Sequence, residues 1–275
     1  MGVRIDLVAQ HLTRVPSREE WRDLEILNLS NNEIARLDNL DHLCRIRELN
    51  LSTNQICRIG KVCKLQTLEI LDLSSNRIQC VEGLQYLVRL QRLSLADNHI
   101  SKFPAFSLVG LRFLDLSGNK FQSIPNVLQL CSLEALYLDG NQIATLECVG
   151  RHLPSSLKIL GLAKNYIRDL TQVAYLSCLL NLSQLSLCQN PCLSLSSSLV
   201  HTFDYRPYLL CCCPSLKAID AFSVSETEVL KELQLNELSA KSIVMTTGPQ
   251  HINLWLTKEE GPEKWDRGWH HGNQN

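Results

Sequence analysis

Hydrophobic residues recur along this chain in the pattern L-x-x-L-x-L-x-x-N-x-I, with polar residues between them. Copies begin at Leu24, Ile46, Leu68, Leu90, Leu111, Leu133, Leu157 and Leu182, so successive copies are 21 to 25 residues apart. The central L-x-L predicts a short strand with alternate side chains turned inward. A repeat of this length cannot bury its own apolar face, so neighbouring copies must stack.

After each strand, apolar residues continue at a spacing of about three. Examples are Ile34, Leu37, Leu40 and Leu43 in the first copy, and Ile78, Val81, Leu84 and Leu87 in the third. This spacing predicts short helices or 3₁₀ turns that face the core. The sequence therefore predicts an α/β fold, a right-handed leucine-rich-repeat solenoid shaped as an arc, with a parallel concave sheet and the short helices on the convex side.

One Asn recurs at the turn of every copy. An Asn amide has both donor and acceptor groups, and a stacked column of amides can satisfy the backbone groups that each turn leaves unpaired. We predict a structural ladder of Asn32, Asn54, Asn76, Asn98, Asn119, Asn141, Asn165 and Asn190.

Four segments follow from the repeat positions. Residues 1–23 form a degenerate N-terminal coil, in which Ile5, Leu7 and Leu12 keep apolar positions and Gln10 takes the place of Asn. Residues 24–193 hold eight repeats, 194–247 form a C-terminal cap with a helix, and 248–275 form a mobile tail without the pattern. Both ends need closing because the last coils would otherwise expose the core.

The cap is predicted from "FDYRPYLLCCCPSLKAID", where Leu216 and Ile219 repeat the strand spacing and residues 205–213 suit a helix. Tyr205, Arg206 and Pro207 begin that helix. Beyond it, Ser225 with Glu228 three residues later has the form of a capping box. The apolar residues of the helix that would follow are Val229, Leu230, Leu233 and Leu238.

Composition narrows the classes of partner. The 27 basic and 28 acidic residues give a formal charge of -1, which offers no overall field for nucleic acid or an anionic membrane. No run of 18 apolar residues or signal peptide is present, so we expect an intracellular protein with reduced cysteines. Cys211, Cys212 and Cys213 suit either packing or zinc, and His270 and His271 could hold a metal only with further ligands, so no metal site is predicted.

No catalytic motif is found: the sequence has no phosphate-binding loop, G-x-S-x-G elbow, H-E-x-x-H or dinucleotide fingerprint. Isolated carboxylates such as Asp72 and Asp115 on an open sheet lack the enclosed setting that tunes acid-base groups. We therefore expect no catalytic residue, no enzyme activity and no cofactor.

The candidate binding residues lie between the core leucines, where side chains on the concave face vary from repeat to repeat. They are Glu48, Ile70, Asp72, Arg92, Phe113, Asp115, Tyr137, Asp139 and Ile159. Protein interfaces favour such mixtures of aromatic, aliphatic and charged groups. The alternative is that the apolar members only favour strand formation and that the aspartates recur as part of the repeat.

Several motifs carry a resemblance to known families. The 22-residue copies with "NPC", "YRPY" and "CPSLKAID" resemble the SDS22-like class of leucine-rich repeats. The segments "NRIQCVEGL" at Asn76, "LPSSLKILGLAKNYIRDL" at Leu153, "LSLCQNPC" at Leu185 and "FDYRPY" at Phe203 are similar to a family of centrosomal leucine-rich-repeat and IQ-domain proteins, from about residue 20 to 256.

The resemblance implies a scaffold of the centrosome and centriole, within the cytoplasm and cytoskeleton. It implies a 110-kDa coiled-coil protein as partner, with which the family caps the mother centriole and restrains cilium assembly. Calmodulin binding is not expected, because the IQ-bearing region of the family has no counterpart here. The SDS22-like class also includes a regulatory subunit of protein phosphatase 1, and regulation of that phosphatase is the alternative function.

Overall fold

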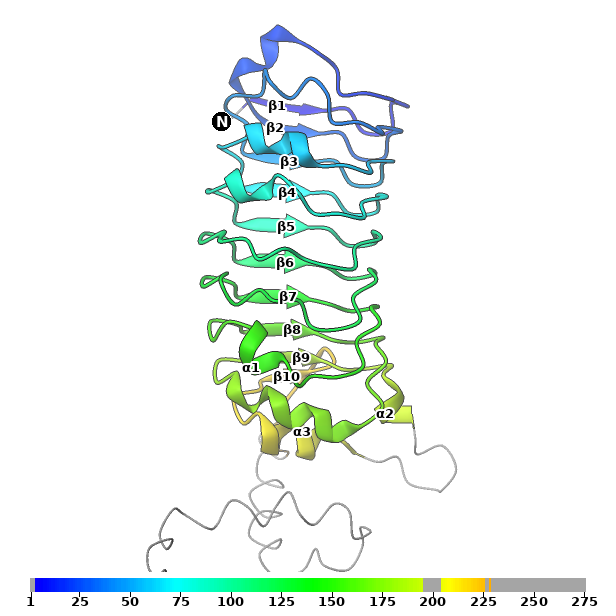
Figure 1. Cartoon of the computed structure of the whole chain (residues 1–275), viewed down its shortest axis with the longest axis vertical. Helices are drawn as coiled ribbons and strands as arrows, with labels where there is room; N and C mark the ends of the chain where they lie inside the picture. Colours follow the sequence, from blue (N-terminus) through cyan, green and yellow to red (C-terminus); the bar gives the residue numbers. More distant parts are fainter. Residues whose placement is uncertain (1–2, 195–203, 226–227, 229–275) are drawn as a thin grey trace, which may run out of the picture.

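The computed structural model describes residues 3–194, 204–225 and 228. The described strands form one eleven-stranded sheet and stack in chain order (Figure 1). All neighbours are parallel except β10 and β11, which are antiparallel. The fold is a leucine-rich-repeat solenoid, as predicted. The strands are β1 (Val3–Asp6), β2 (Leu24–Asn28), β3 (Glu48–Asn50), β4 (Ile70–Asp72), β5 (Arg92–Ser94), β6 (Phe113–Asp115), β7 (Ala135–Tyr137), β8 (Ile159–Gly161), β9 (Gln184–Ser186), β10 (Ala218–Ile219) and β11 (Phe222–Ser223).

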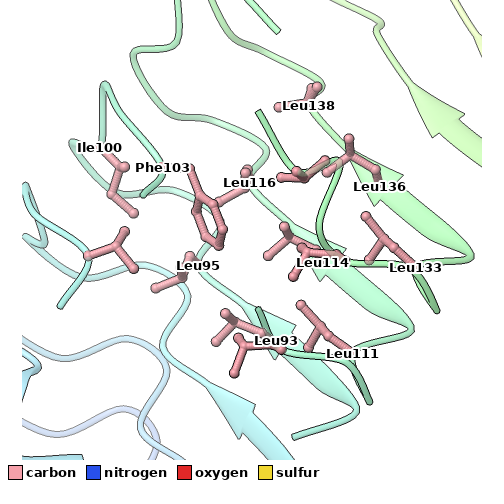
Figure 2. Close-up of a cluster of buried hydrophobic side chains, with 14 of the residues drawn as sticks. Leu93, Leu95, Ile100, Phe103, Leu111, Leu114, Leu116, Leu133, Leu136 and Leu138 are labelled. Carbon is pink, nitrogen blue, oxygen red and sulfur yellow. The ribbon is translucent and has the colours of Figure 1, made fainter. Parts of the chain in front are cut away.

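The strand leucines form a continuous column through the interior. Leu93 on β5 is in register with Leu114 on β6, which is in register with Leu136 on β7. All three are fully buried, and Figure 2 shows them beside Leu111 and Leu133 on adjacent coils. Burying one leucine stabilises a fold by about 1.5–3 kcal/mol. Stacking therefore supplies the stability that no single repeat could supply.

A second column consists of the turn asparagines, which are all buried. Asn54 is representative: its Nδ2 donates to the carbonyls of Leu29 and Leu51, both at 3.0 Å, and its Oδ1 accepts from the N–H of Ile34 at 2.9 Å. All eight asparagines make this set of three bonds, and none is more than 8% exposed. Each amide therefore joins its own coil to the preceding one.

Helical turns occur in only some of the described return segments. They are η2 (Gly60–Lys64), η3 (Leu84–Tyr86) and η4 (Leu170–Cys178), which are 3₁₀ helices, and α1 (Val149–His152). The segment 34–43 has no helix although its spacing predicts one, and there Asn39 has a positive φ of 62°. Pro104 and Pro125 fall in two further segments without a helix, and proline lacks the N–H that a helical turn needs. The apolar spacing is therefore kept for burial rather than for helix formation.

The N-terminal coil continues the sheet through β1. Ile5, Leu7 and Leu12 are partly buried and pack against the core. Gln10 does not extend the buried ladder, because its side chain is exposed and only its backbone N–H contacts the ladder, donating to Oδ1 of Asn32 at 3.0 Å. Between this coil and β2, the 3₁₀ helix η1 (Glu19–Asp23) buries Trp21.

At the other end, α2 (Pro191–Ser194) and α3 (Arg206–Cys212) follow the last full repeat. Leu209 and Leu210 of α3 are buried, and β10 pairs with β9, so Ile219 ends the leucine column. The helix predicted over 205–213 is thus present. The helix residues Val229, Leu230, Leu233 and Leu238, the pair His270 and His271, and the tail 248–275 lie outside the described residues.

Candidate partner-binding face

The side chains between the core leucines form two rows across the exposed face of the sheet. Register places Ile26, Glu48, Ile70, Arg92, Phe113, Ala135, Ile159 and Gln184 in the first row. The second row holds Asn28, Asn50, Asp72, Ser94, Asp115, Tyr137, Gly161 and Ser186. Of the predicted binding residues, all but Asp139 lie in these rows, since Asp139 follows the end of β7.

Three side chains at the middle of this face stack in order, with Phe113 between Arg92 and Tyr137. The guanidinium carbon of Arg92 lies 4.4 Å from the centroid of the Phe113 ring. The Phe113 and Tyr137 rings are 5.4 Å apart and tilted by 46°. A cation over an aromatic face and a tilted ring pair each gain about 0.5–1.5 kcal/mol. We call these residues the aromatic stack, and it spans β5, β6 and β7.

The aspartates of the second row also have local structural roles. Oδ1 of Asp72 accepts from the backbone N–H of Ser74 at 2.9 Å, and Oδ1 of Asp115 accepts from the N–H of Ser117 at 2.9 Å. Asn50 makes the same contact with Ser52. Such bonds are typical of Asx turns. The repeated "LDLS" therefore closes the turn, in line with the alternative interpretation of these carboxylates.

Asp139 supports the next coil instead of extending the row. Its Oδ1 accepts from the N–H of Ala163 at 2.7 Å. Its Oδ2 occupies the space beside Gly161, because a Cβ at that glycine would lie 2.2 Å from Oδ2. Burial, and to a smaller extent the charge of Asp115, raises the pKa of Asp139. Gly161 is one residue that the sequence analysis missed; its signal is "ILGLAKN", with Gly where other repeats carry a polar side chain.

Tyr137 presents the hydroxyl of the aromatic stack. Burial, followed by the nearby charges of Asp115 and Asp139, raises the pKa of Tyr137 above its usual value. The phenol is therefore neutral near pH 7 and can donate a hydrogen bond. The centre of the face thus combines an apolar surface, a cation and a donor, with carboxylates at its edge.

Features of metal-binding and membrane-spanning proteins are absent from the described residues. Within residues 3–194, 204–225 and 228, no three His, Cys, Asp or Glu side chains are grouped to hold a metal ion. Cys213 packs in the core, and burial raises the pKa of its thiol to about 12. No described helix is long and apolar enough to span a membrane.

The cap residues form a polar network of their own. The Tyr205 hydroxyl donates to Oδ2 of Asp220 at 2.5 Å, while Oδ1 of Asp220 accepts from the N–H groups of Leu187 and Cys188. Arg206 donates to Glu228 at 2.5 Å and to the carbonyl of Ile219 at 3.1 Å. Pro207 lies in the first turn of α3, and Leu216 is buried. Sequence reasoning missed Asp220, which closes the solenoid where no further Asn follows.

Glu228 also completes the capping box predicted from the sequence. Its Oε2 accepts from the N–H of Ser225 at 2.7 Å, and its own N–H donates to the Ser225 hydroxyl at 3.3 Å. The Arg206 guanidinium, followed by these bonds, lowers the pKa of Glu228 to about 2. The cap is therefore held by a charged pair, which is only 17% and 23% exposed at Arg206 and Glu228.

Comparison with family models identifies leucine-rich repeats in the chain. A leucine-rich-repeat model matches residues 21–108, and a model of two leucine-rich-repeat copies matches residues 109–150. Among curated proteins, the chain is similar to the centrosomal protein of 97 kDa, at 47% identity over 88 residues in Xenopus laevis and 43% over 89 residues in Homo sapiens. Each alignment covers 32% of this chain and 11% or 10% of the relative. The match spans about a tenth of the length of these relatives.

Solved structures agree on the fold. An internalin of Listeria monocytogenes superposes with a TM-score of 0.64 at 24% identity, covering 81% of this chain and 62% of its own. Internalin C2 of the same organism gives a TM-score of 0.59 at 28% identity, covering 67% of this chain and 80% of its own. A leucine-rich-repeat protein of Leptospira interrogans gives 0.62 at 23% identity, covering 78% and 60%.

Proposed function

We propose that this leucine-rich-repeat protein is a non-enzymatic scaffold of the centrosome and that it holds a protein partner on the aromatic stack of Arg92, Phe113 and Tyr137. The observation that carries the binding site is the stack itself. The fold accounts for the buried leucines and asparagines, whereas a large aromatic pair with a cation on the exposed sheet face has no such role in the core. Aromatic residues and arginine dominate the binding energy of protein interfaces.

The centrosomal location rests on the relatives. The centrosomal proteins of 97 kDa of Xenopus laevis and Homo sapiens share 47% and 43% of the aligned residues with this chain. We extend the proposal to the partner that the family resemblance implies. In this proposal the chain binds a 110-kDa coiled-coil protein and restrains cilium assembly. A helix of a coiled coil presents apolar and charged side chains on one side, which suits a stack that is apolar, cationic and acidic at its edge.

Imaging and proximity labelling of the tagged full chain test the proposal. We expect enrichment at centrioles and recovery of centriolar proteins. Phe113→Ala with Tyr137→Ala should remove the labelled partners from the recovered set. The matched control is Tyr86→Ala with Tyr166→Ala, which removes two exposed rings, 55% and 56% exposed, outside the sheet face. Absence of centriolar enrichment, or equal loss of partners in both double variants, contradicts the proposal.

The SDS22-like alternative makes a different prediction from the same face. Aromatic and acidic groups at the sheet face, among them Phe113, Tyr137 and Asp115, are a surface that could hold a phosphatase catalytic subunit. A pull-down with protein phosphatase 1 separates the two functions. Retention of the phosphatase that is lost in the Phe113→Ala, Tyr137→Ala variant, without centriolar proteins, would replace the centrosomal proposal.

A further inference from the structure

The first row of the exposed sheet face alternates between apolar and charged side chains over strands β2 to β6, which follow one another along the stack (Figure 1). We call these residues the alternating row, and in register order they are Ile26, Glu48, Ile70, Arg92 and Phe113. Arg92 is exposed and the other four are partly exposed. Apolar groups therefore recur at every second coil, with an acidic and then a basic residue between them.

The second row beside the alternating row consists of shorter polar side chains that are bonded to their own turns. Oδ1 of Asn28 accepts from the N–H of Ser30 at 3.1 Å. Asn50 and Asp72 accept from the backbone N–H two residues later in the same way, both at 2.9 Å. The longer side chains of the alternating row are therefore the groups that a partner contacts on this part of the face.

The spacing of the alternating row indicates the secondary structure of its partner. Neighbouring strands are about 4.8 Å apart, so residues two coils apart are separated by about 9.6 Å. Side chains on one side of an α-helix recur every seven residues, over about 10.5 Å, with an intermediate contact three or four residues on. A tilt of about 24° between helix and stack removes the difference. An extended peptide repeats its side chains about every 6.8 Å along the stack, which matches neither one coil nor two.

From this geometry we infer that the alternating row binds an amphipathic α-helix of a protein partner, which lies along the stack of coils. Apolar residues at every seventh position of the helix pack on Ile26, Ile70 and Phe113. Between them, a basic residue faces Glu48 and an acidic residue faces Arg92. These opposite charges fix the register and the direction of the helix. The inference rests on the proposed protein-binding function and extends the site from the aromatic stack towards β2.

Fluorescence anisotropy with the full chain and a labelled peptide of three heptads tests the alternating row. Each heptad begins with leucine; lysine stands in the middle of the first heptad, glutamate in the middle of the second, and alanine and glutamine elsewhere favour the helix. We expect saturable binding. The same peptide with two central prolines cannot form the helix and should not bind. Absence of binding by the helical peptide, or equal binding of both peptides, would overturn the inference.

Ile70→Lys tests an apolar contact outside the aromatic stack. The same row holds Glu48 and Arg92 in the adjacent coils, so the fold accommodates a charged side chain at this position. The affinity should fall about tenfold or more, because the leucine of the peptide loses its apolar contact. The matched control is Tyr86→Lys, which introduces the same charge at a residue of η3 that is 55% exposed and lies outside the sheet face. It should stay within about twofold of wild type.

Glu48→Lys tests the charge contact by exchange. It should weaken binding of the peptide about fivefold or more and should favour a second peptide in which glutamate replaces the lysine, because opposite charges then face each other again. Circular dichroism checks that each variant folds. Equal loss for both peptides would contradict the assigned direction of the helix. Loss of binding in Phe113→Ala with Tyr137→Ala but not in Ile70→Lys would overturn this inference and leave the proposed function intact.

Discussion

The Asn ladder and the aromatic stack are both columns of stacked side chains, but one faces inward and the other outward. Asn98 is 3% exposed and makes bonds to the coil before it and to its own coil. Phe113 and Tyr137 lie on the sheet face, where they contact each other and where Arg92 covers the Phe113 ring. The ladder repeats in all eight copies, whereas the stack occurs once. Residues that are the same in every repeat thus stabilise the fold, whereas residues that vary form the exposed face on which we propose a partner binds.

Removal of one ladder amide should have the largest effect on stability. Asn98→Ala leaves the buried N–H of Ile78 without its acceptor and removes one of the two amide bonds to each of the carbonyls of Leu73 and Leu95, which keep Asn76 and Asn119 as donors. We expect a loss of about 2–4 kcal/mol in the free energy of unfolding, since an unsatisfied buried N–H costs about 1–3 kcal/mol and each lost hydrogen bond about 0.5–1.5 kcal/mol. Urea denaturation followed by circular dichroism measures it. Gln79→Ala, an exposed amide in the same part of the solenoid, should cost under about 0.5 kcal/mol. Equal costs would contradict the structural role of the ladder.

Loss of the aromatic stack should cost less stability than loss of a ladder amide, although it removes the proposed binding surface. We expect Phe113→Ala with Tyr137→Ala to lower the free energy of unfolding by about 1–2 kcal/mol, from one ring pair and one cation–π contact. The same denaturation experiment checks this. A loss as large as that of Asn98→Ala would mean that the stack serves the fold, and the contrast between the two columns would fail.

The C-terminal cap differs from the Asn ladder in its dependence on pH. The Glu228 carboxylate in the cap titrates, whereas the ladder amides do not. The pKa of Glu228 is about 2 in the folded chain, below the usual 4.5. Its stabilising contribution is therefore present above about pH 4.5 and is lost as the pH falls towards 2. We expect a lower Tm for Glu228→Gln than for wild type at pH 7 and a difference that shrinks towards pH 2. Thermal unfolding at several pH values measures this, and a constant difference would argue against the Arg206 pair as its cause.

Much of the fold could be predicted because each repeat carries the same pattern of apolar residues and a turn asparagine. The period predicts the stacked strands, the column of leucines and the turn asparagines, and residues 205–213 predict α3. The prediction of a short helix or 3₁₀ turn in segment 34–43 was wrong, because no helix forms there. The apolar spacing buries these side chains whether or not the backbone is helical. Gln10 occupies the sequence position of a ladder asparagine, but its side chain is exposed at the N-terminal end of the solenoid.

For the candidate site, the sequence could predict which residues share the exposed face of the sheet but not the contacts between their side chains. The sequence indicates that Arg92, Phe113 and Tyr137 share one face, since alternation decides which side chains point away from the core. It does not indicate that the Arg92 guanidinium covers Phe113, that Asp72 turns back to Ser74, or that Asp139 supports the next coil. These contacts depend on rotamers and on neighbours about 20 residues away.

The sequence by itself determined the solenoid, its interior and the exposed face of its sheet, because the 22-residue period and the leucine alternation are local and repeated. Tertiary structure alone decided which charges meet. Stacking paired Arg47 with Glu69 on one flank and placed Arg14 beside Arg36 on the other. The physical reason is that contacts between coils depend on the small differences in repeat length and on side-chain direction, which no single repeat contains.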